Sequence, residues 1–263
     1  MGTTNSPPTV TGFAFYTVGP LDPRTVADTV TAWLGDRPAT AVTTITTAPD
    51  VDGETLHSVK HRWADYANDP QTPNLTFYAD TTSHAIDGGF DDGSVTGLSL
   101  IHLALSEPEP LPPARVLEII DTVWREFRPA YGIVYPARTT FDAYSYAYVN
   151  GSIVYPEWDN PFLFADDAPL YGGPSDHTGP RLRLVYPHSL LNADHLVIDV
   201  AGMPLRRWIT ADPDRGQIVE TPSGASVWQV ADDRIEGVTR TLGEAGVLLS
   251  WSPRGPRRRL PLP

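Results

Sequence analysis

The stretch PPARVLEIIDTVWREFRPAYGIVYP, residues 112–136, predicts a helix that leads directly into a buried strand. Pro113 suits the first helical turn, where the N–H that proline lacks would have no partner. Apolar side chains then recur every three or four residues, which places them on one helix face. They are Val116, Ile120, Val123, Trp124 and Phe127. Pro129 ends this helix. The apolar run Tyr131–Tyr135 that follows is typical of a strand, with Ile133 in the core.

Upstream of this stretch the pattern alternates between strands and helices. Asp22 is a side-chain acceptor directly before Pro23, a pair that is typical of a helix start. The run at 94–105 is apolar on both faces, as in a strand at the centre of a sheet. The expected elements in chain order are a strand at 13–18, a helix at 22–35, a strand at 39–47, a helix at 54–67 and strands at 74–80 and 94–105.

Downstream, short β-type runs dominate. Trp208 and Trp228 lie in two of these runs among alternating neighbours, so we expect both indoles in the core. The predicted strands are 145–149, 181–186, 196–200, 203–210, 216–220, 225–230 and 245–251, with a helix from Asp232 or Asp233 to Leu242 before the last. The fold class predicted from the whole pattern is α+β, a mostly antiparallel twisted sheet with about four helices packed on it.

The ends of the chain differ in composition from the body. Residues 1–9 are polar and proline-containing, and we expect a disordered N-terminus there. Residues 10–252 form a single α+β domain in this prediction, and a division into two subdomains near 136–180 stays open. Residues 253–263 make a basic tail that is rich in proline and arginine. The sequence does not fix the oligomeric state.

Charge and cysteine content narrow the classes of function. The 263-residue chain has a formal net charge of −13 and no cysteine. Without cysteine it has no disulfide, no thiolate nucleophile and no thiolate-ligated metal. An acidic surface repels nucleic acid and anionic membranes and attracts basic partners. The sequence also has no apolar run of membrane-spanning length and no leader-like N-terminus, so we expect a cytoplasmic protein.

Motifs that carry chemistry are weak in this chain. His57 and His61 share one helix face, as helical metal ligands do, but the position of the motif's catalytic carboxylate holds none, and a solvated face explains them better. Ser175, Asp176 and His177 are adjacent, whereas a catalytic triad converges from separate parts of a fold. We therefore predict no catalytic residue, no metal and no cofactor.

A combination of aromatic and acidic residues is the most distinctive remaining feature. Between Tyr144 and Phe164, aromatic side chains alternate with carboxylates, and we expect a strand and loop at the rim of the sheet with some rings exposed. Tyrosine and tryptophan are enriched at binding hot spots. The candidate partner-binding residues are the acidic and aromatic positions of three expected loops: Asp87, Asp91, Asp92, Glu157, Trp158, Asp159, Asp166, Asp167 and Asp176.

The C-terminal half resembles a known family. VYPHSLLNADHL at 185–196, LRRWI at 205–209, GQIV at 216–219 and VWQV at 227–230 are similar to segments of the immunity protein 52 family and related bacterial polymorphic-toxin immunity proteins. The upstream WREFRPAYG, residues 124–132, fits the same layout, so the resemblance covers about residues 113–250.

This resemblance implies a non-enzymatic cytoplasmic protein that binds and neutralises a bacterial toxin. Many such toxins are basic, so the partner is expected to be a toxin domain with a basic surface. Two alternatives stay open. One is an enzyme whose site joins His177, His188 or His195 to carboxylates. The other is a scaffold or phage-associated interaction protein.

Overall fold

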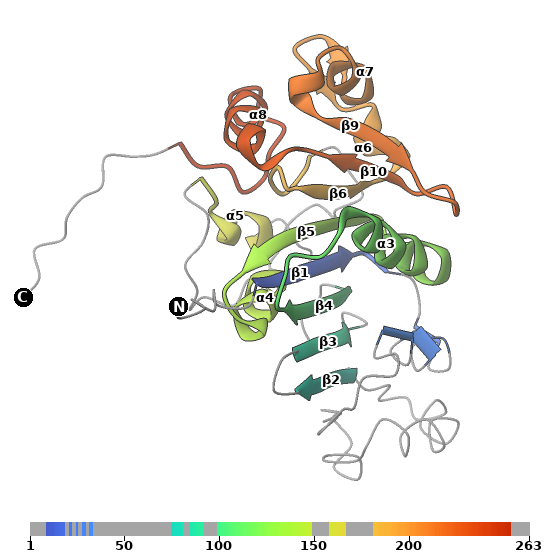
Figure 1. Ribbon diagram of the computed structural model, residues 1–263. Helices are drawn as coiled ribbons and strands as arrows, with labels where there is room; N and C mark the ends of the chain where they lie inside the picture. Colours follow the sequence, from blue (N-terminus) through green and yellow to red (C-terminus); the bar gives the residue numbers. More distant parts are fainter. Residues whose placement is uncertain are drawn as a thin grey trace, which may run out of the picture.

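A computed structural model of the chain describes residues 9–18, 21–22, 25, 28–29, 32–33, 75–80, 85–91, 99–148, 158–166 and 181–253. Figure 1 shows one large sheet with helices on both of its faces. Two expected elements, the strand at 39–47 and the helix at 54–67, lie outside the described residues, as do His57 and His61.

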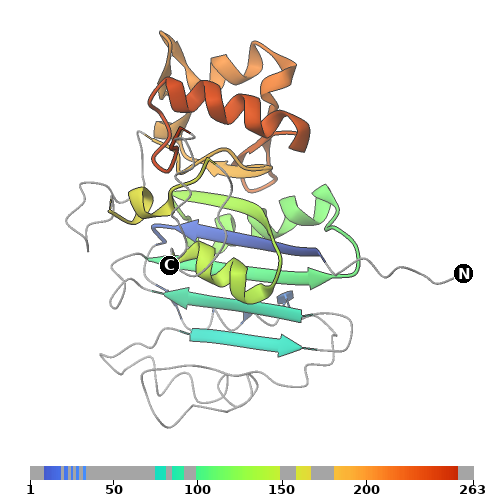
Figure 2. The same cartoon turned by 90° about the vertical axis from the view of Figure 1, so that its left-hand side faces the viewer.

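The main sheet has eight strands in the order β2-β3-β4-β1-β5-β6-β10-β9. Every neighbouring pair is antiparallel. Figure 2 shows the alternating directions of β2, β3, β4 and β1. The strands are β1 (Thr9–Tyr16), β2 (Leu75–Asp80), β3 (Ala85–Asp91), β4 (Leu100–Glu107), β5 (Tyr131–Ala137), β6 (His188–Leu191), β9 (Gln217–Glu220) and β10 (Ser226–Gln229). A separate hairpin pairs β7 (Asp199–Val200) with β8 (Met203–Pro204). The predicted α+β class with a mostly antiparallel sheet is confirmed.

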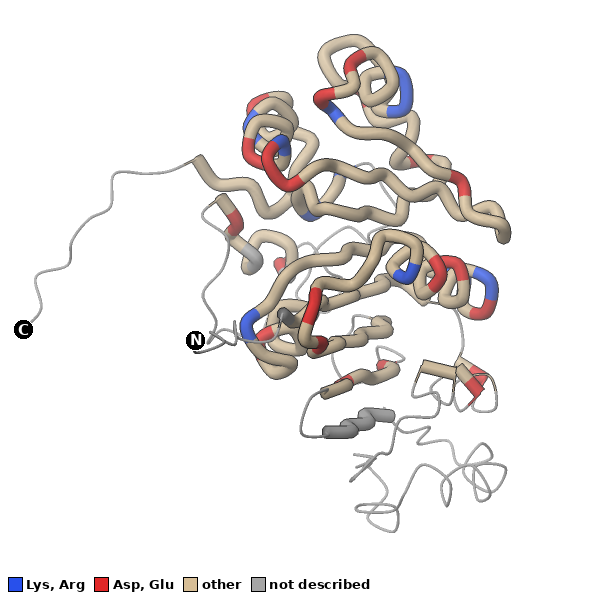
Figure 3. Tube along the Cα trace, viewed as in Figure 1, with Lys and Arg blue, Asp and Glu red and all other residues tan. Residues whose placement is uncertain are grey.

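Both faces of the sheet are covered, because the side chains of β1 alternate between two apolar clusters, one on each face. Phe13 and Phe15 pack in one apolar cluster, whereas Ala14 and Tyr16 pack in a second cluster on the opposite face. This is the period of two that a pleated strand imposes. Neither β1 nor β5 carries a charged residue, and Figure 3 shows the charged positions mainly on the surrounding helices and strand ends.

Helix α3 (Pro113–Phe127) covers the Phe13 face, and its prediction from the opening stretch is confirmed. Val116, Ile120 and Val123 are buried against the sheet. Its C-terminal cap, Arg128, has a φ of 48° and lies over the Trp124 ring, with 5.3 Å between the guanidinium carbon and the ring centroid. The separate helix predicted at 22–35 also shows its expected start, where the Thr25 N–H donates to the Asp22 carboxylate at 2.9 Å.

The opposite face of the sheet carries residues of α4 and of the C-terminal region. The helices there are α4 (Thr140–Ala147), α5 (Pro161–Asp166), α6 (Ala193–Leu196), α7 (Leu205–Thr210) and α8 (Asp232–Glu244), with a short 3-10 turn, η3 (Pro213–Arg215). With α3, six α-helices have bounds within the described ranges, against about four predicted. No helix in the described part of the chain is long and apolar enough to cross a bilayer.

Two segments predicted as strands are helices. The run at 145–149 belongs largely to α4, whose N-cap Thr139 accepts a hydrogen bond from the Asp142 N–H at 3.0 Å. The run at 203–210 contains α7, in which Leu205, Trp208 and Ile209 are buried at helical spacing. Aromatic residues and threonine favour strands, and here the tertiary packing overrides that preference. Trp208 and Trp228 are nevertheless buried, as expected.

Other predicted elements also need correction. The acidic loop expected at 87–92 is wrong for Asp87 and Asp91, which belong to the strand β3, paired on both edges. The predicted strands at 181–186 and 245–251 contribute only isolated bridges, such as Leu182 with Leu248. The strand expected at 196–200 is reduced to β7, because α6 occupies Ala193–Leu196.

Candidate protein-binding surface

Helix α5 is anchored to the molecule by one buried ring. Phe164 is fully buried, and its ring meets the ring of Tyr16 edge-on with 5.1 Å between centroids. Because Tyr16 belongs to the central strand β1, this contact ties α5 to the middle of the sheet. Neighbouring Phe162 and Leu163 have exposed fractions of 53% and 43%. A six-residue helix thus has one side fixed in the core and two apolar side chains in solvent.

Arg183 lies beneath this helix and is fully buried. Its Nη1 donates to the Tyr16 hydroxyl at 2.7 Å, and its Nη2 donates to the backbone carbonyl of Tyr146 at 3.0 Å. The guanidinium carbon lies 4.1 Å from the ring centroid of Tyr146 and 4.8 Å from that of Phe164. Through these contacts Arg183 joins β1, α4 and α5. Hydrogen bonds from a cation are roughly twice as strong as neutral ones.

Asp159 provides the negative charge of this network. Its Oδ2 accepts a hydrogen bond of 2.5 Å from the Tyr146 hydroxyl, which also lies 2.8 Å from the hydroxyl of Tyr186. Burial raises the pKa of Tyr146, so the phenol keeps its proton and can donate it. Burial also raises the pKa of Asp159, although the charge of Arg183 opposes this shift. We refer to Arg183, Tyr16, Tyr146, Tyr186 and Asp159 as the Arg183 network.

Backbone hydrogen bonds hold the same segment from the C-terminal side. The Asn160 N–H donates to the Ser250 carbonyl at 2.7 Å, and the Ser252 N–H donates to the Trp158 carbonyl at 2.9 Å. The guanidinium carbon of Arg240, on α8, lies 5.5 Å from the ring centroid of Trp158. Residues 158–166 are therefore fixed by α4, α8 and the core.

The outer side of this fixed segment combines apolar and acidic groups. Phe162 and Leu163 are exposed, Trp158 is half-buried, and Asp166 is exposed at the end of the helix. We call these four residues the α5 patch. Clusters of exposed aromatic and aliphatic side chains with polar neighbours mark protein-binding surfaces. Because the backbone beneath is already fixed, binding would cost little ordering entropy.

The structure separates the candidate residues that it describes into two groups. Trp158, Asp159 and Asp166 lie in or beside the α5 patch, although Asp159 points inward to Tyr146. Asp87 and Asp91 lie in β3 rather than in a loop. Asp91 is only 2% exposed, because it lies on the face of the sheet that α4 covers. Asp92, Glu157, Asp167 and Asp176 lie outside the described residues.

A second polar cluster, the His102 cluster, lies under α4 and comprises His102, Asp87, Asp91, Tyr144 and Tyr148. The Nε2 of His102, on β4, lies 3.2 Å from Asp87 Oδ1, and His102 is 1% exposed. The rings of Tyr144 and Tyr148 meet the imidazole edge-on at 5.1 and 5.3 Å. Burial, and secondarily the charges of Asp87 and Asp91, raise the pKa of Tyr144.

Sequence reasoning missed the central residue of each cluster. Arg183 is a lone cation in the apolar run LRLVY at 182–186, and His102 interrupts the apolar run at 100–105. A single polar residue inside an apolar run was the available signal in both cases, because such a residue must find partners when it is buried. Nothing in the sequence indicated which residues those partners are.

The histidines considered as enzyme candidates do not meet carboxylates in the described structure. His195 is fully buried, and its Nδ1 accepts the Asn192 N–H at 3.2 Å. Burial lowers its pKa to about 4. Burial also lowers the pKa of His188, which is opposed by the charge of Asp232. His177 lies outside the described residues, and the described part of the chain holds no group of three side chains that could ligate a metal.

Comparisons with known proteins give no family. No protein-family model matches the chain, and no curated protein matches it. Among solved structures, one match is the crystal structure of Trypanosoma brucei AdoMetDC-delta26 monomer, at 13% sequence identity. It covers 58% of this chain and 56% of that chain with a TM-score of 0.27, so the chain spans little more than half the length of that structure. A TM-score this low supports no inference about fold or activity.

Proposed function

We propose that this protein is a cytoplasmic immunity protein that binds and neutralises a bacterial toxin, and that the α5 patch takes part in the complex. The observation that carries the proposal is the pair of exposed side chains, Phe162 and Leu163, on a segment fixed by the Arg183 network. The family resemblance of residues 113–250 supplies the class of partner.

The chemistry of the α5 patch favours a partner with basic and apolar groups. An arginine or lysine of the partner can lie over the exposed Phe162 ring and pair with the Asp166 carboxylate. The net charge of −13 attracts a basic domain over distance and raises the association rate, whereas burial of Phe162 and Leu163 slows dissociation. Inhibition then follows from tight association, without turnover.

Co-expression with a secreted toxin encoded beside this gene tests the proposal. We expect the wild type to protect cells, and Phe162→Glu to lose protection and pull-down, because a carboxylate replaces the exposed ring. Phe162→Glu should lower the free energy of unfolding by no more than about 1 kcal/mol, since the side chain is 53% exposed. Phe141→Glu is the matched control, because Phe141 on α4 is 60% exposed outside the α5 patch.

Two outcomes count against the proposal. Absence of both protection and a complex at low salt would reject the immunity function. Equal protection by wild type and Phe162→Glu would retain an immunity function but remove the α5 patch from it. Each outcome is readable only if circular dichroism shows that the variant folds as the wild type does.

An enzyme is the second candidate, and the His102 cluster is the observation that favours it. Asp87 can orient the imidazole of His102, as a carboxylate does beside a general base. This candidate requires a turnover activity that His102→Gln abolishes while the thermal unfolding midpoint changes little. If the activity survives in His102→Gln, the cluster is structural.

A further inference from the structure

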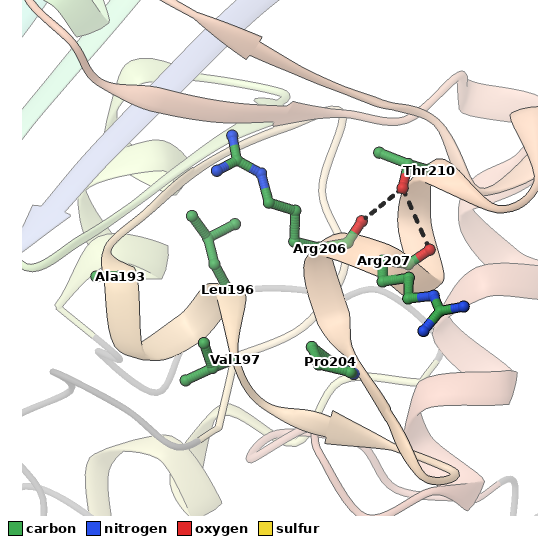
Figure 4. Close-up of a pocket in the computed structure, with 7 residues that line it drawn as sticks. All are labelled: Ala193, Leu196, Val197, Pro204, Arg206, Arg207 and Thr210. Carbon is green, nitrogen blue, oxygen red and sulfur yellow. Dashed lines mark hydrogen bonds between the residues drawn. The ribbon is translucent and has the colours of Figure 1, made fainter.

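A separate groove lies between the C-terminal end of α6 and the first turn of α7 (Figure 4). Leu196, Val197 and Pro204 form its apolar floor, and Arg206 and Arg207 line it from α7. Val197 is 66% exposed, the largest value among the exposed large hydrophobic residues of the described chain. The groove therefore offers an exposed aliphatic surface at Val197 and the guanidinium groups of two arginines.

The walls of the groove are fixed from within. The Asn192 side chain caps α6 by accepting the His195 N–H at 2.8 Å, and His195 is buried. The Leu205 N–H donates to the Ile198 carbonyl at 2.8 Å, which joins the start of α7 to the end of the α6 turn. The buried ring of Trp208 holds α7 in place from below. The groove is therefore preformed, and little conformational entropy is lost when it is filled.

The two arginines differ in their partners. Arg206 Nη2 pairs with Glu220 Oε1 on β9 at 2.5 Å. Arg207 is exposed and forms no ion pair with any residue that the structure describes. Arg207 is therefore the cation of this groove whose charge no described carboxylate pairs, on a chain with a net charge of −13. Its charge is opposite to that expected of the toxin-facing α5 patch.

We propose that this groove binds an acidic amphipathic peptide segment of a partner protein. An aliphatic side chain of the segment packs on Leu196, Val197 and Pro204, and a flanking carboxylate pairs with Arg207. Charge complementarity favours this occupant. The positive charges of a basic segment would be repelled by Arg206 and Arg207, and a neutral segment would leave Arg207 without a carboxylate partner. This second interaction is independent of toxin binding at the α5 patch.

A peptide titration of the full-length chain tests this inference. The probe is acetyl-Glu-Leu-Glu-Glu-Leu-Glu-amide, followed by backbone amide chemical shifts in NMR spectra. We expect saturable shifts at Val197 and Arg207. Arg207→Glu and Val197→Glu should each weaken binding roughly tenfold or more, since each places a carboxylate in the groove. Arg138→Glu is the matched charge control, because Arg138 is exposed and does not line the groove.

Control peptides decide between occupants. Replacing both leucines by serine should abolish the shifts, and so should replacing all glutamates by lysine. The inference is overturned if the lysine peptide binds equally well, if no peptide shifts these amides, or if Arg207→Glu binds as the wild type does. Self-association in ultracentrifugation that Val197→Glu removes would assign the groove to a second copy of this chain and would also overturn it.

Discussion

The Arg183 network and the His102 cluster are both buried on the α4 face of the sheet, but their polar groups are satisfied to different degrees. Arg183 donates two side-chain hydrogen bonds and lies against two aromatic rings, although its buried Nε has no hydrogen-bond partner among the described residues. His102 has one polar contact at 3.2 Å, and its buried Nδ1 has no hydrogen-bond partner among the described residues. The first cluster joins Arg183 to Tyr16, 167 positions away in the chain. The second joins adjacent strands and α4.

The difference indicates how each cluster contributes. A buried charge whose partners come from distant segments can exist only when those segments are all in place, so the Arg183 network couples α5 to the fold of the sheet. His102 makes a single polar contact, with Asp87, so its cluster offsets less of the desolvation of its buried groups and contributes less to stability. The proposed function is compatible with this division, since the Arg183 network lies beneath the α5 patch.

The largest expected effect comes from removing the central cation. Arg183→Met should lower the free energy of unfolding by roughly 3–5 kcal/mol, because it leaves Asp159 buried without the opposing charge. Urea unfolding of the purified chain measures this loss. The double variant Arg183→Met with Asp159→Asn should recover part of it. A loss below about 1 kcal/mol in Arg183→Met would show that the network does not hold the fold.

His195 should make stability depend on pH. Its ring is buried, with 5.1 Å between its centroid and that of the Tyr131 ring on β5. Its pKa is lowered from 6.5 to about 4, because burial disfavours the charged imidazolium. The folded state thus binds this proton less readily than the unfolded state. The resulting stability is present above pH 6.5 and is lost as the pH falls through 4, by roughly 3 kcal/mol.

Comparison with His195→Gln isolates this contribution. The raised pKa of Asp159 acts with the opposite sign, since it favours the folded state as the pH falls, but it is present in both proteins and cancels in the difference. Thermal unfolding between pH 7 and 4 should show a shallower pH dependence in the variant. Equal slopes would contradict the buried neutral state of His195.

Two tyrosines of α4 provide a matched test with a smaller effect. Tyr146→Phe removes the donor to Asp159 and should cost roughly 1–3 kcal/mol. The Tyr148 hydroxyl makes no side-chain hydrogen bond to any described residue, so Tyr148→Phe should stay within about 0.5 kcal/mol of the wild type. Chemical denaturation of both variants measures the pair. Equal costs would remove the proposed distinction between the two clusters.

The elements that sequence predicts well are those with strong local patterns. Helix α3 has a proline start, a clear apolar face and a proline after its end, and each of these signals is local. In contrast, α4 was interpreted as a strand because Tyr144, Tyr146 and Tyr148 alternate. The structure places Tyr144 and Tyr148 at His102, whereas Tyr146 contacts Arg183, because residues four apart share a helix face.

The candidate site was predicted only in part. Composition pointed to an aromatic and acidic loop at 157–167, but the loop prediction is wrong for Pro161–Asp166, which form helix α5 with proline at its first position. The sequence did not indicate which side of α5 faces solvent. That side is set by the contacts of Phe164 with Tyr16 and Arg183, which are far apart in the chain. Asp87 and Asp91 were assigned to a loop because glycine and aspartate disfavour strands, yet pairing with β2 and β4 on both sides outweighs that preference.

Hydrogen exchange of this protein, with and without the proposed toxin partner, tests the central claim most directly. We predict that binding slows exchange at residues 158–166, which carry the α5 patch, and leaves α3 unchanged because it lies on the opposite face of the sheet. A complex that forms with wild-type affinity but slows exchange only at other segments would contradict the assignment of the α5 patch as the toxin-binding surface.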